Sequence, residues 1–403
     1  MNNKVSNIQI GMFLFLIISG IYLSVSDVIL LRKSGNEVLI AMLLGTFIGL
    51  IPVLMYLKIN STMPNLNIFN KNNKLFGKII GNIINILLIF IYMIFLAMSS
   101  RAVVIFVTSK YLQNTNYFLI GALVLVTSLI ISFKGTKTIA RISQMSFTIV
   151  IILVVIIELF LIKYVEIGNI LPMFTGDNYI KDIIDGAIYH ASTCSMLTFL
   201  LLVIKKDKVN KPKKYNKTII IFYLLGSLSL TLVMFFVVSC FGYEMATLFR
   251  YPEYILLKKI GLANSELHLE NLLAFRWIFY MISLANISIY GIIKGVKSFS
   301  IKNKLTNVII IILSIIGIIM GKTAGAIPHS INVVKNYFVP RIALPIFVLF
   351  SNNGYAYFKF YTTRFKAYEV ENKLIIIHEA VKNENTTVFG RKIGCGLIKK
   401  YRI

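Results

Sequence analysis

The chain has 403 residues, and 57% of them are hydrophobic. A soluble domain cannot bury so many apolar residues, and the apolar runs recur from end to end. The sequence therefore predicts an all-α polytopic membrane protein and excludes a soluble enzyme with one anchor. The formal net charge of +26 could indicate a nucleic-acid partner. That partner is excluded as well, because the charges lie in the segments between the apolar runs.

The first apolar run, residues 8–31, contains one charge, at Asp27, and is long enough to cross a hydrocarbon core of about 30 Å as a helix. Small and polar residues interrupt its second half, and they are Ser19, Gly20, Tyr22, Ser24 and Ser26. Since glycine is a poor helix former, the helix is predicted to weaken near Ser19 and Gly20. Two interpretations follow: an opened backbone that lines a transporter-type site at the membrane midplane, or small residues that pack closely against another helix.

Ten apolar segments, including the first run, are predicted to span the membrane. They cover residues 8–31, 37–57, 79–109, 117–133, 144–163, 183–204, 217–241, 271–293, 305–321 and 339–358. Residues 1–358 therefore form the transmembrane domain, and residues 359–403 form a separate tail. The longest outer segment, residues 242–270, has an alternating pattern that predicts short amphipathic helices at the interface, either capping a vestibule or simply packing there.

The distribution of charge predicts the orientation. With the N-terminus in the cytoplasm, the inner segments hold 19 Lys/Arg and one acid, whereas the outer segments hold ten Lys/Arg and nine acids. Cytoplasmic loops of membrane proteins carry the excess of Lys and Arg, which favours this orientation. Ten spans then return the chain to the cytoplasm, where the tail, with ten Lys/Arg and four Glu, is expected to contact anionic lipid.

Four ionisable residues lie within or beside the predicted spans, where a charge is costly and needs an explanation. Asp27 either sits at the outer interface near Arg32 or faces an outer vestibule, where it would attract an ammonium group. Glu158 either reaches the interface or faces the bundle, where it could serve proton coupling or pair with Arg101. Arg276 is expected in the interfacial aromatic belt, with binding of a ligand carboxylate as the alternative.

Residue types that carry catalysis or bind metals form no recognisable constellation in the sequence. The histidines are His190, His268, His329 and His378, and the cysteines are Cys194, Cys240 and Cys395, none of them at a metal-ligand spacing. A glycine-rich nucleotide loop and a serine nucleophile with its base are not recognisable either. The chain is therefore not expected to be an enzyme or to bind a metal or cofactor.

Short segments along residues 5–290 resemble one family, the spore-germination permeases. The opening Val-Ser-Asn-Ile-Gln at residues 5–9 is similar to that family's Ile-Ser-x-x-Gln, and Ser100-Arg101 is similar to its Leu-Arg near the end of the third span. The other matching segments are residues 33–37, 63–69, 75–78, 134–135, 139–141, 170–172, 241–244 and 250–252. These permeases are the B-type subunits of germinant receptors, within the amino acid–polyamine–organocation transporter superfamily.

The resemblance implies a five-plus-five inverted repeat, with the first and sixth helices broken around a ligand site at the midplane. The sixth span departs from the family pattern. Where the family commonly reads Ser-Phe-Pro-Phe-Gly-Glu, residues 192–197 read Ser-Thr-Cys-Ser-Met-Leu, so a proton-coupled step by that acid does not carry over. The small polar residues either allow local unwinding or pack as a helix whose side chains bond back to carbonyl groups.

The resulting hypothesis is a membrane subunit of a spore nutrient-germinant receptor, in the spore inner membrane, that binds a small germinant, with an amino acid expected. The backbone at residues 19–21 would meet the ligand carboxylate at the positive end of a half-helix, and binding would be signalled to A-type and C-type subunits. The predicted ligand-binding residues are Ser19, Gly20, Ile21, Tyr22, Ser24, Tyr189, Ser192, Thr193, Ser195 and Tyr280. The candidates for charge coupling are Asp27, Arg101 and Glu158.

Two other functions are compatible with ten spans. One is a secondary amino acid or polyamine transporter that acts by itself, without receptor partners. The other is a membrane enzyme of polysaccharide assembly, which usually carries long outer loops with several arginines and acids. The longest outer segment here is modest, so the enzyme is the least favoured of the three.

Overall fold

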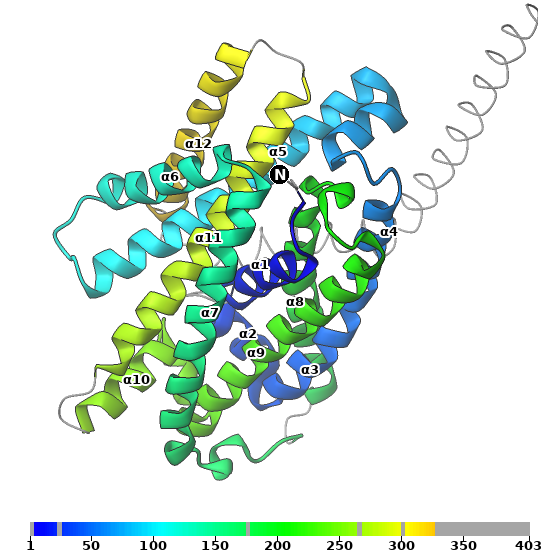
Figure 1. Cartoon of the computed structure of the whole chain (residues 1–403). Coiled ribbons are helices and arrows are strands. Elements are labelled where there is room, and N and C mark those ends of the chain that lie inside the picture. Colours follow the sequence, from blue (N-terminus) through cyan, green and yellow to red (C-terminus); the bar gives the residue numbers. More distant parts are fainter. Residues whose placement is uncertain (1–3, 22–25, 175–177, 264–267, 300–302, 327–403) are drawn as a thin grey trace, which may run out of the picture.

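The computed structural model describes residues 4–21, 26–174, 178–263, 268–299 and 303–326, and this part of the chain is almost entirely helical (Figure 1). Seven described helical segments are long and apolar enough to cross a membrane, and two shorter apolar helices accompany them. The chain is therefore a multi-pass membrane protein, as predicted. The predicted tenth span, residues 339–358, and the tail lie outside the described residues, so the count of ten stays a prediction.

The predicted first span consists of two helices, α1 (Asn7–Ser19) and α2 (Ser26–Ser34). α1 ends at Gly20, and a side chain would not fit there, because a Cβ atom would lie 2.6 Å from the Cβ atom of Tyr280. The interruption predicted near Ser19 and Gly20 is confirmed. Close approach of the neighbouring helix is the physical reason for glycine at this position.

Spans two to five lie close to their predicted positions. They consist of η1 (Gly35–Glu37) with α3 (Val38–Ile48) and α4 (Leu50–Ser61), then α5 (Ile68–Lys110), α6 (Tyr117–Phe133) and α7 (Thr136–Leu161). Inside α5, Gly77 has φ 77°, a left-handed value that favours glycine. The residues before Gly77 therefore form a short helix of their own, and the third span begins after it.

Spans six to nine are helical as well. They are α8 (Tyr179–Phe199) continued by η4 (Leu200–Val203), α9 (Pro212–Leu248), α11 (Leu269–Lys297) and α12 (Asn303–Ala326). The connections contain η2 (Ile162–Tyr164), η3 (Ile167–Ile170) and η5 (Lys206–Lys208). Helix α10 (Pro252–Ala263) lies between spans seven and eight, within the segment where a short helix was predicted.

The sixth span stays α-helical through the residues where local unwinding was considered. Ser192 Oγ and Thr193 Oγ1 both donate hydrogen bonds to the Tyr189 carbonyl, over 3.0 and 2.7 Å, so their hydroxyl groups are satisfied inside the helix. The change from α to 3₁₀ geometry comes only at Leu200, beyond these residues. The back-bonded helix is therefore the observed alternative, and residues 192–195 contain no break.

The contacts between spans follow the symmetry that an inverted repeat requires. Span two (α3) packs on span six (α8), and span seven (α9) packs on span one (α1). Span three (α5) packs on span nine (α12), and span eight (α11) packs on span four (α6), while spans three and eight contact each other. In a five-plus-five repeat, span one corresponds to span six, span two to span seven, and so on. Under this correspondence the pair two–six becomes the pair seven–one, and the pair three–nine becomes the pair eight–four. The repeat itself stays a prediction, because its tenth span lies outside the described residues.

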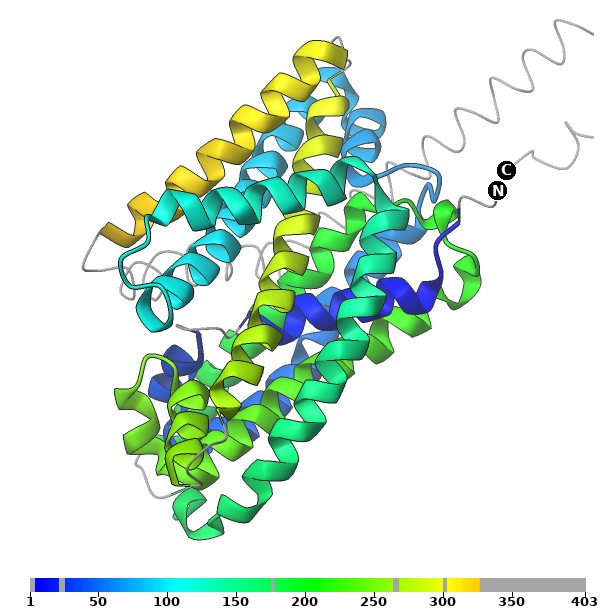
Figure 2. The ribbon, with the colours of Figure 1, turned by 60° about the vertical axis from the view of Figure 1, so that its left-hand side comes forward.

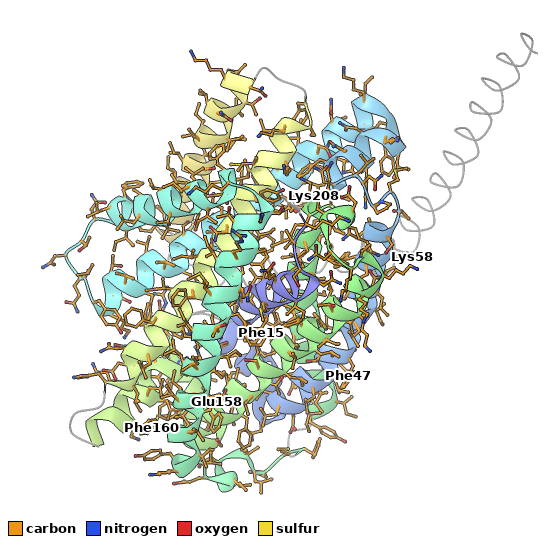
Figure 3. All side chains as sticks on the ribbon, in the orientation of Figure 1. Phe15, Phe47, Lys58, Glu158, Phe160 and Lys208 are labelled. Carbon is orange, nitrogen blue, oxygen red and sulfur yellow. The ribbon has the colours of Figure 1, made fainter. Side chains whose placement is uncertain are left out.

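The loops divide between two faces of the helical bundle. The N-terminal segment lies against the loop between spans six and seven, since the Val5 N–H donates to the Lys208 carbonyl over 2.9 Å. Lys206 Nζ donates to Ser61 Oγ over 2.8 Å, which brings the end of span two to the same face. We call this the N-terminal face and the opposite one the far face; Lys58 and Lys208 mark the former in Figure 3. Its assignment to the cytoplasm stays a prediction.

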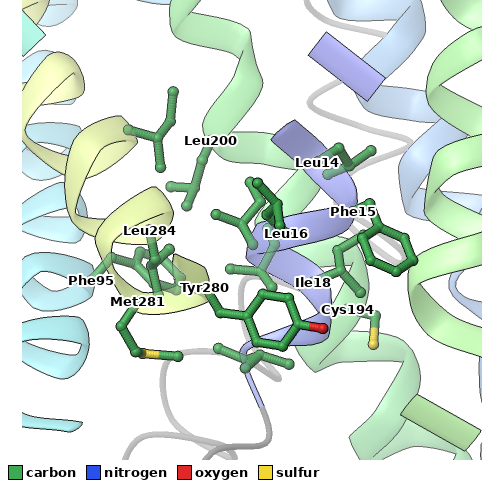
Figure 4. Packing of buried hydrophobic residues seen from close by; sticks show 14 of the residues in the cluster. Leu14, Phe15, Leu16, Ile18, Phe95, Cys194, Leu200, Tyr280, Met281 and Leu284 are labelled. Atoms are coloured by element: carbon green, nitrogen blue, oxygen red, sulfur yellow. The ribbon is translucent and has the colours of Figure 1, made fainter. Parts of the chain in front are cut away.

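Helix α1 crosses the middle of the bundle, where it contacts α7, α9 and α11 (Figure 2). Its last turns lie in the main hydrophobic core, and Figure 4 shows Leu14, Leu16 and Ile18 of α1 in the same cluster as Tyr280, Met281 and Leu284 of α11. Large exposed apolar side chains cover the outward surfaces of α5, α6 and α7, as expected for helices in contact with lipid. The interruption of the first span therefore lies inside the bundle, where neighbouring helices enclose it.

A buried polar cluster, called the neutral cluster below, joins spans two, six and seven. Ser227 Oγ lies 2.7 Å from both Thr46 Oγ1 and His190 Nε2, and Thr46 also donates to the Met42 carbonyl over 2.8 Å. The side chains of Thr46, His190 and Ser227 are fully buried. Gly45 allows this close packing, because a Cβ atom there would lie 2.6 Å from the Ala187 carbonyl oxygen.

Candidate functional site

A buried charged cavity lies beside the interruption of the first span, toward the far face. It has a volume of about 20 Å³, which is room for about one water molecule. Residues of α1, α2, α9, α10 and α11 line it. The cavity therefore meets the first span at the same place where the sequence predicts a ligand site.

Arg276 of α11 and Glu253 of α10 form an ion pair in this cavity. Their side chains are only 3% and 8% exposed. Glu253 lies in the first turn of α10, where a helix favours negative charge. The sequence placed Arg276 in an interfacial belt, but the structure buries it, because Glu253 offsets the charge that would otherwise hold it at the interface.

Two further carboxylates are close enough to this ion pair to interact with it electrostatically. Asp27 lies in the first turn of α2 and interacts electrostatically with both Arg276 and Glu253. Glu158 of α7 also interacts with Arg276 and Glu253, and its Oε1 atom is buried without a hydrogen-bond partner. We call these four residues, Asp27, Glu158, Glu253 and Arg276, the charged cluster. With all its groups ionised it has an excess of two negative charges, which in a low dielectric favours the uptake of a cation.

The rest of the cavity wall is partly apolar. Leu230, Val233, Met234 and Val237 of α9 form one side of it. On the α11 side lie Tyr280 and Trp277, the only tryptophan of the chain. A few polar groups in a mostly apolar enclosure are typical of sites for small molecules.

The structure brings several of the predicted ligand-binding residues to this cavity. Ser19 and Tyr280 line it, and Gly20 and Ile21 follow directly after Ser19 in the buried core. The backbone N–H groups of Gly20 and Ile21 donate to the Leu16 and Ile18 carbonyls, over 3.2 and 3.1 Å, so they are not available to a ligand carboxylate. Tyr22 and Ser24 lie outside the described residues.

The predicted site residues of the sixth span lie elsewhere. None of Tyr189, Ser192, Thr193 and Ser195 lines the charged cavity. Their side chains sit on α8, which packs mainly against α3. The hydroxyl groups of Ser192, Thr193 and Ser195 donate hydrogen bonds to carbonyl groups within α8.

Arg101 is separate from the charged cluster. Its guanidinium donates to the Gly321 carbonyl of α12 over 3.1 Å. The pair considered between Glu158 and Arg101 is not formed, and Glu158 interacts with Arg276 instead. The packing of the helices explains this. Arg101 is on α5 and Glu158 is on α7, and α11 contacts both of these helices.

Sequence reasoning missed Glu253 as a site residue. It counted only as one of the acids of the outer segment, and no local pattern sets it apart from its neighbours. The available signal was indirect, because an arginine within an apolar helix, such as Arg276, requires a buried partner. The sequence could not identify which acid supplies that partner.

Comparison with known proteins identifies the family. A family model described as "Spore germination protein" matches residues 4–326. The chain is 25% identical over 220 residues to YfkT of Bacillus subtilis (strain 168), whose name also refers to spore germination; this covers 54% of the chain and 59% of YfkT. It is 24% identical over 260 residues to the spore germination protein YndE of the same organism, covering 64% of the chain and 70% of YndE. The alignment with YfkT thus spans less than two thirds of that protein.

A solved structure supports the fold. The chain is similar to Mhp1, a nucleobase-cation-symport-1 family transporter in a closed conformation with bromovinylhydantoin bound, with a TM-score of 0.59 and 12% identity over 79% of this chain and 72% of Mhp1. Family and fold are those of permeases, so the polysaccharide-assembly enzyme considered above is excluded. Since the family match extends over nearly all of the described residues, the chain belongs to the spore germination protein family, as its sequence motifs predicted.

Proposed function

We propose that this chain is the membrane subunit of a nutrient-germinant receptor, which binds a small germinant in the charged cavity and signals to partner subunits. The observation that carries the proposal is the meeting of the interrupted first span with a buried arginine and three carboxylates. Such a cluster is costly within a membrane domain and is typically kept where a polar ligand or an ion binds. The family description supports germination as the process.

The chemistry of the cavity favours an amino acid as the germinant. Asp27, on the cavity wall, suits an ammonium group, and Arg276 suits a carboxylate. The apolar residues of α9, such as Val233 and Met234, suit a small hydrocarbon side chain. The proposed site therefore lies between spans one, seven and eight and α10, and the predicted residues of the sixth span lie outside it.

The size of the cavity indicates how binding could become a signal. A volume of about 20 Å³ cannot hold an amino acid, so the described conformation has to open before a ligand enters. A ligand that binds the open form shifts the conformational equilibrium toward it. We propose that A-type and C-type subunits sense this shift, in the spore inner membrane, with the N-terminal face and the C-terminal tail in the cytoplasm.

Germination assays test the proposal. Spores that carry Arg276→Gln are expected to lose nutrient-triggered germination, whereas spores with Arg101→Gln, a guanidinium outside the cavity, should respond as the wild type does. Both proteins must be present at wild-type levels in the spore membrane. Unchanged germination of the Arg276→Gln spores across all twenty amino acids and a panel of sugars and nucleosides would contradict the proposal.

A secondary transporter that acts by itself is the second candidate. The excess of carboxylates over cations in the charged cluster supports it, because such a site could take up a proton or another cation together with a solute. Uptake of labelled amino acids into proteoliposomes distinguishes the two functions. Uptake by the purified chain, with normal germination of a deletion strain, would favour the transporter.

A further inference from the structure

Helix α10 closes the charged cavity on the far face, and one side chain fastens it there. Glu253 reaches from its first turn into the cavity and pairs with Arg276 of α11. Removing one partner of such a buried pair leaves an uncompensated charge, whereas replacing one carboxylate by another leaves the charge unchanged. The separation of α10 from α11 therefore costs least free energy when another carboxylate replaces that of Glu253 at Arg276.

The cavity contains a polar atom that the protein itself does not satisfy. Arg276 Nε is buried without a hydrogen-bond partner, and the Arg276 side chain is only 3% exposed. Because buried polar atoms are ordinarily paired, this atom indicates that something polar binds here beyond what α10 provides.

We infer that Glu253 is an internal substitute for the carboxylate of the ligand. This inference rests on the proposed function and adds the mechanism of opening. An amino acid takes Arg276 with its own carboxylate, Glu253 is released, and α10 leaves the cavity. Asp27, which lines the cavity, holds the ammonium group, so that only a molecule with both groups binds and opens the site.

The backbone kinks between the membrane span of α9 and the α10 region. Gly242, near the end of α9, has φ 72°, which separates the last turn of α9 from the membrane span. The aromatic rings around α10 report on its position: Tyr251, directly before α10, lies 5.7 Å from the ring of Trp277. Trp277 is buried, and it is the only tryptophan, so its fluorescence records whether α10 covers it.

The first experiment needs no ligand and uses the purified full-length chain in detergent. Glu253→Gln keeps the size of the side chain but removes its charge, and the nearby Asp27 and Glu158 still compensate Arg276. We expect its tryptophan emission to be red-shifted relative to the wild type, because α10 no longer covers Trp277. Glu244→Gln, which removes an exposed carboxylate from the end of α9, is the matched control and should leave the emission unchanged. Identical emission of Glu253→Gln and wild type would overturn the inference.

The second experiment adds probes: the twenty amino acids, and primary amines that match them but lack the carboxylate. Binding is measured as thermal stabilisation, and opening as Trp277 emission. An amino acid should red-shift the wild type and bind Glu253→Gln about tenfold more tightly, since the internal competitor is gone. The matching amine cannot replace Glu253 at Arg276, so it should neither bind the wild type nor red-shift its emission.

The outcomes separate the inference from the function on which it rests. An amino acid that binds wild type and Glu253→Gln equally well, or an amine that red-shifts the wild type as the amino acid does, overturns the exchange at Arg276 and leaves the receptor proposal standing. No binding of any amino acid to either protein overturns the receptor proposal's ligand assignment. In that case the emission of Glu253→Gln still decides whether Glu253 holds α10 closed.

Discussion

The neutral cluster includes a residue of α9, and the same helix lines the cavity of the charged cluster, but the two clusters are built on different principles. In the neutral cluster, Thr46, His190 and Ser227 lie within 3.3 Å of one another and contain no carboxylate or guanidinium. In the charged cluster, one of three carboxylates pairs with the guanidinium, and polar atoms such as Arg276 Nε stay unpaired. One cluster is complete in itself, whereas the other has unused binding capacity.

This difference indicates which parts of the molecule stay together. A satisfied hydrogen-bond network in a low dielectric fixes the elements that contribute to it, here α3, α8 and α9. An unbalanced cluster is costly in every state unless a ligand or a proton completes it. We therefore expect motion at the junction of α2, α10 and α11, and a rigid unit around α8.

The largest effect should follow from Arg276→Gln, because it leaves the charged cluster without its cation. We expect the free energy of unfolding to fall by about 3–5 kcal/mol, as for other buried pairs that lose one partner. Chemical unfolding in detergent measures it. The double variant Arg276→Gln/Glu253→Gln should be more stable than Arg276→Gln, and a double variant that is less stable would contradict the pairing.

A smaller effect is expected for Gly20→Leu, which alters the wall shared by the first span and α11. A side chain there collides with Tyr280, so unfolding should become easier by about 1–3 kcal/mol, the usual range for overpacking, and ligand binding should be lost. Gly168→Leu is the control, because no atom lies within 4 Å of a Cβ at Gly168. Retained binding at unchanged affinity in Gly20→Leu would show that this wall is not part of the site.

Ser227→Ala tests the neutral cluster, with an expected loss of about 1–3 kcal/mol, since Thr46 and His190 each lose a hydrogen-bond partner. Its ligand response should equal that of the wild type, which distinguishes this cluster from the charged one. Ser314→Ala, which removes only a bond from a side chain to its own helix, should cost less. If the ligand shifted the Trp277 emission of Ser227→Ala by a different amount than that of the wild type, the two clusters would be coupled.

The smallest effect is expected for Ser195→Ala. Its hydroxyl makes a single bond of 3.5 Å to the Ser192 carbonyl, within α8. The stability change should stay below about 1 kcal/mol, and binding should be unaffected. Loss of ligand binding in a folded Ser195→Ala protein would return the sixth span to the site.

Much of the fold could be predicted from local sequence, because apolar length in a membrane determines where helices lie. The described spans occur where the runs predicted them, and the Ser19-Gly20 interruption ends α1 as expected. The same local reasoning left the sixth span open, since small polar residues can either unwind a helix or bond back to it. Only the geometry of α8, with Thr193 donating to the Tyr189 carbonyl, decided that choice.

The site shows the limit more clearly. Composition, span length and glycine positions are properties of short segments, and by themselves they determined an all-α polytopic membrane protein with an interrupted first helix, whereas the permease-like fold was implied by the resemblance to a family. The charged cluster depends on α2, α7, α10 and α11 meeting in space, with Glu253 and Arg276 on different helices and Glu158 on a third. Long-range pairing of charges leaves no periodic signal in the chain, so the tertiary structure alone decided that Arg276, and not Arg101, is the cation at the interruption of the first span.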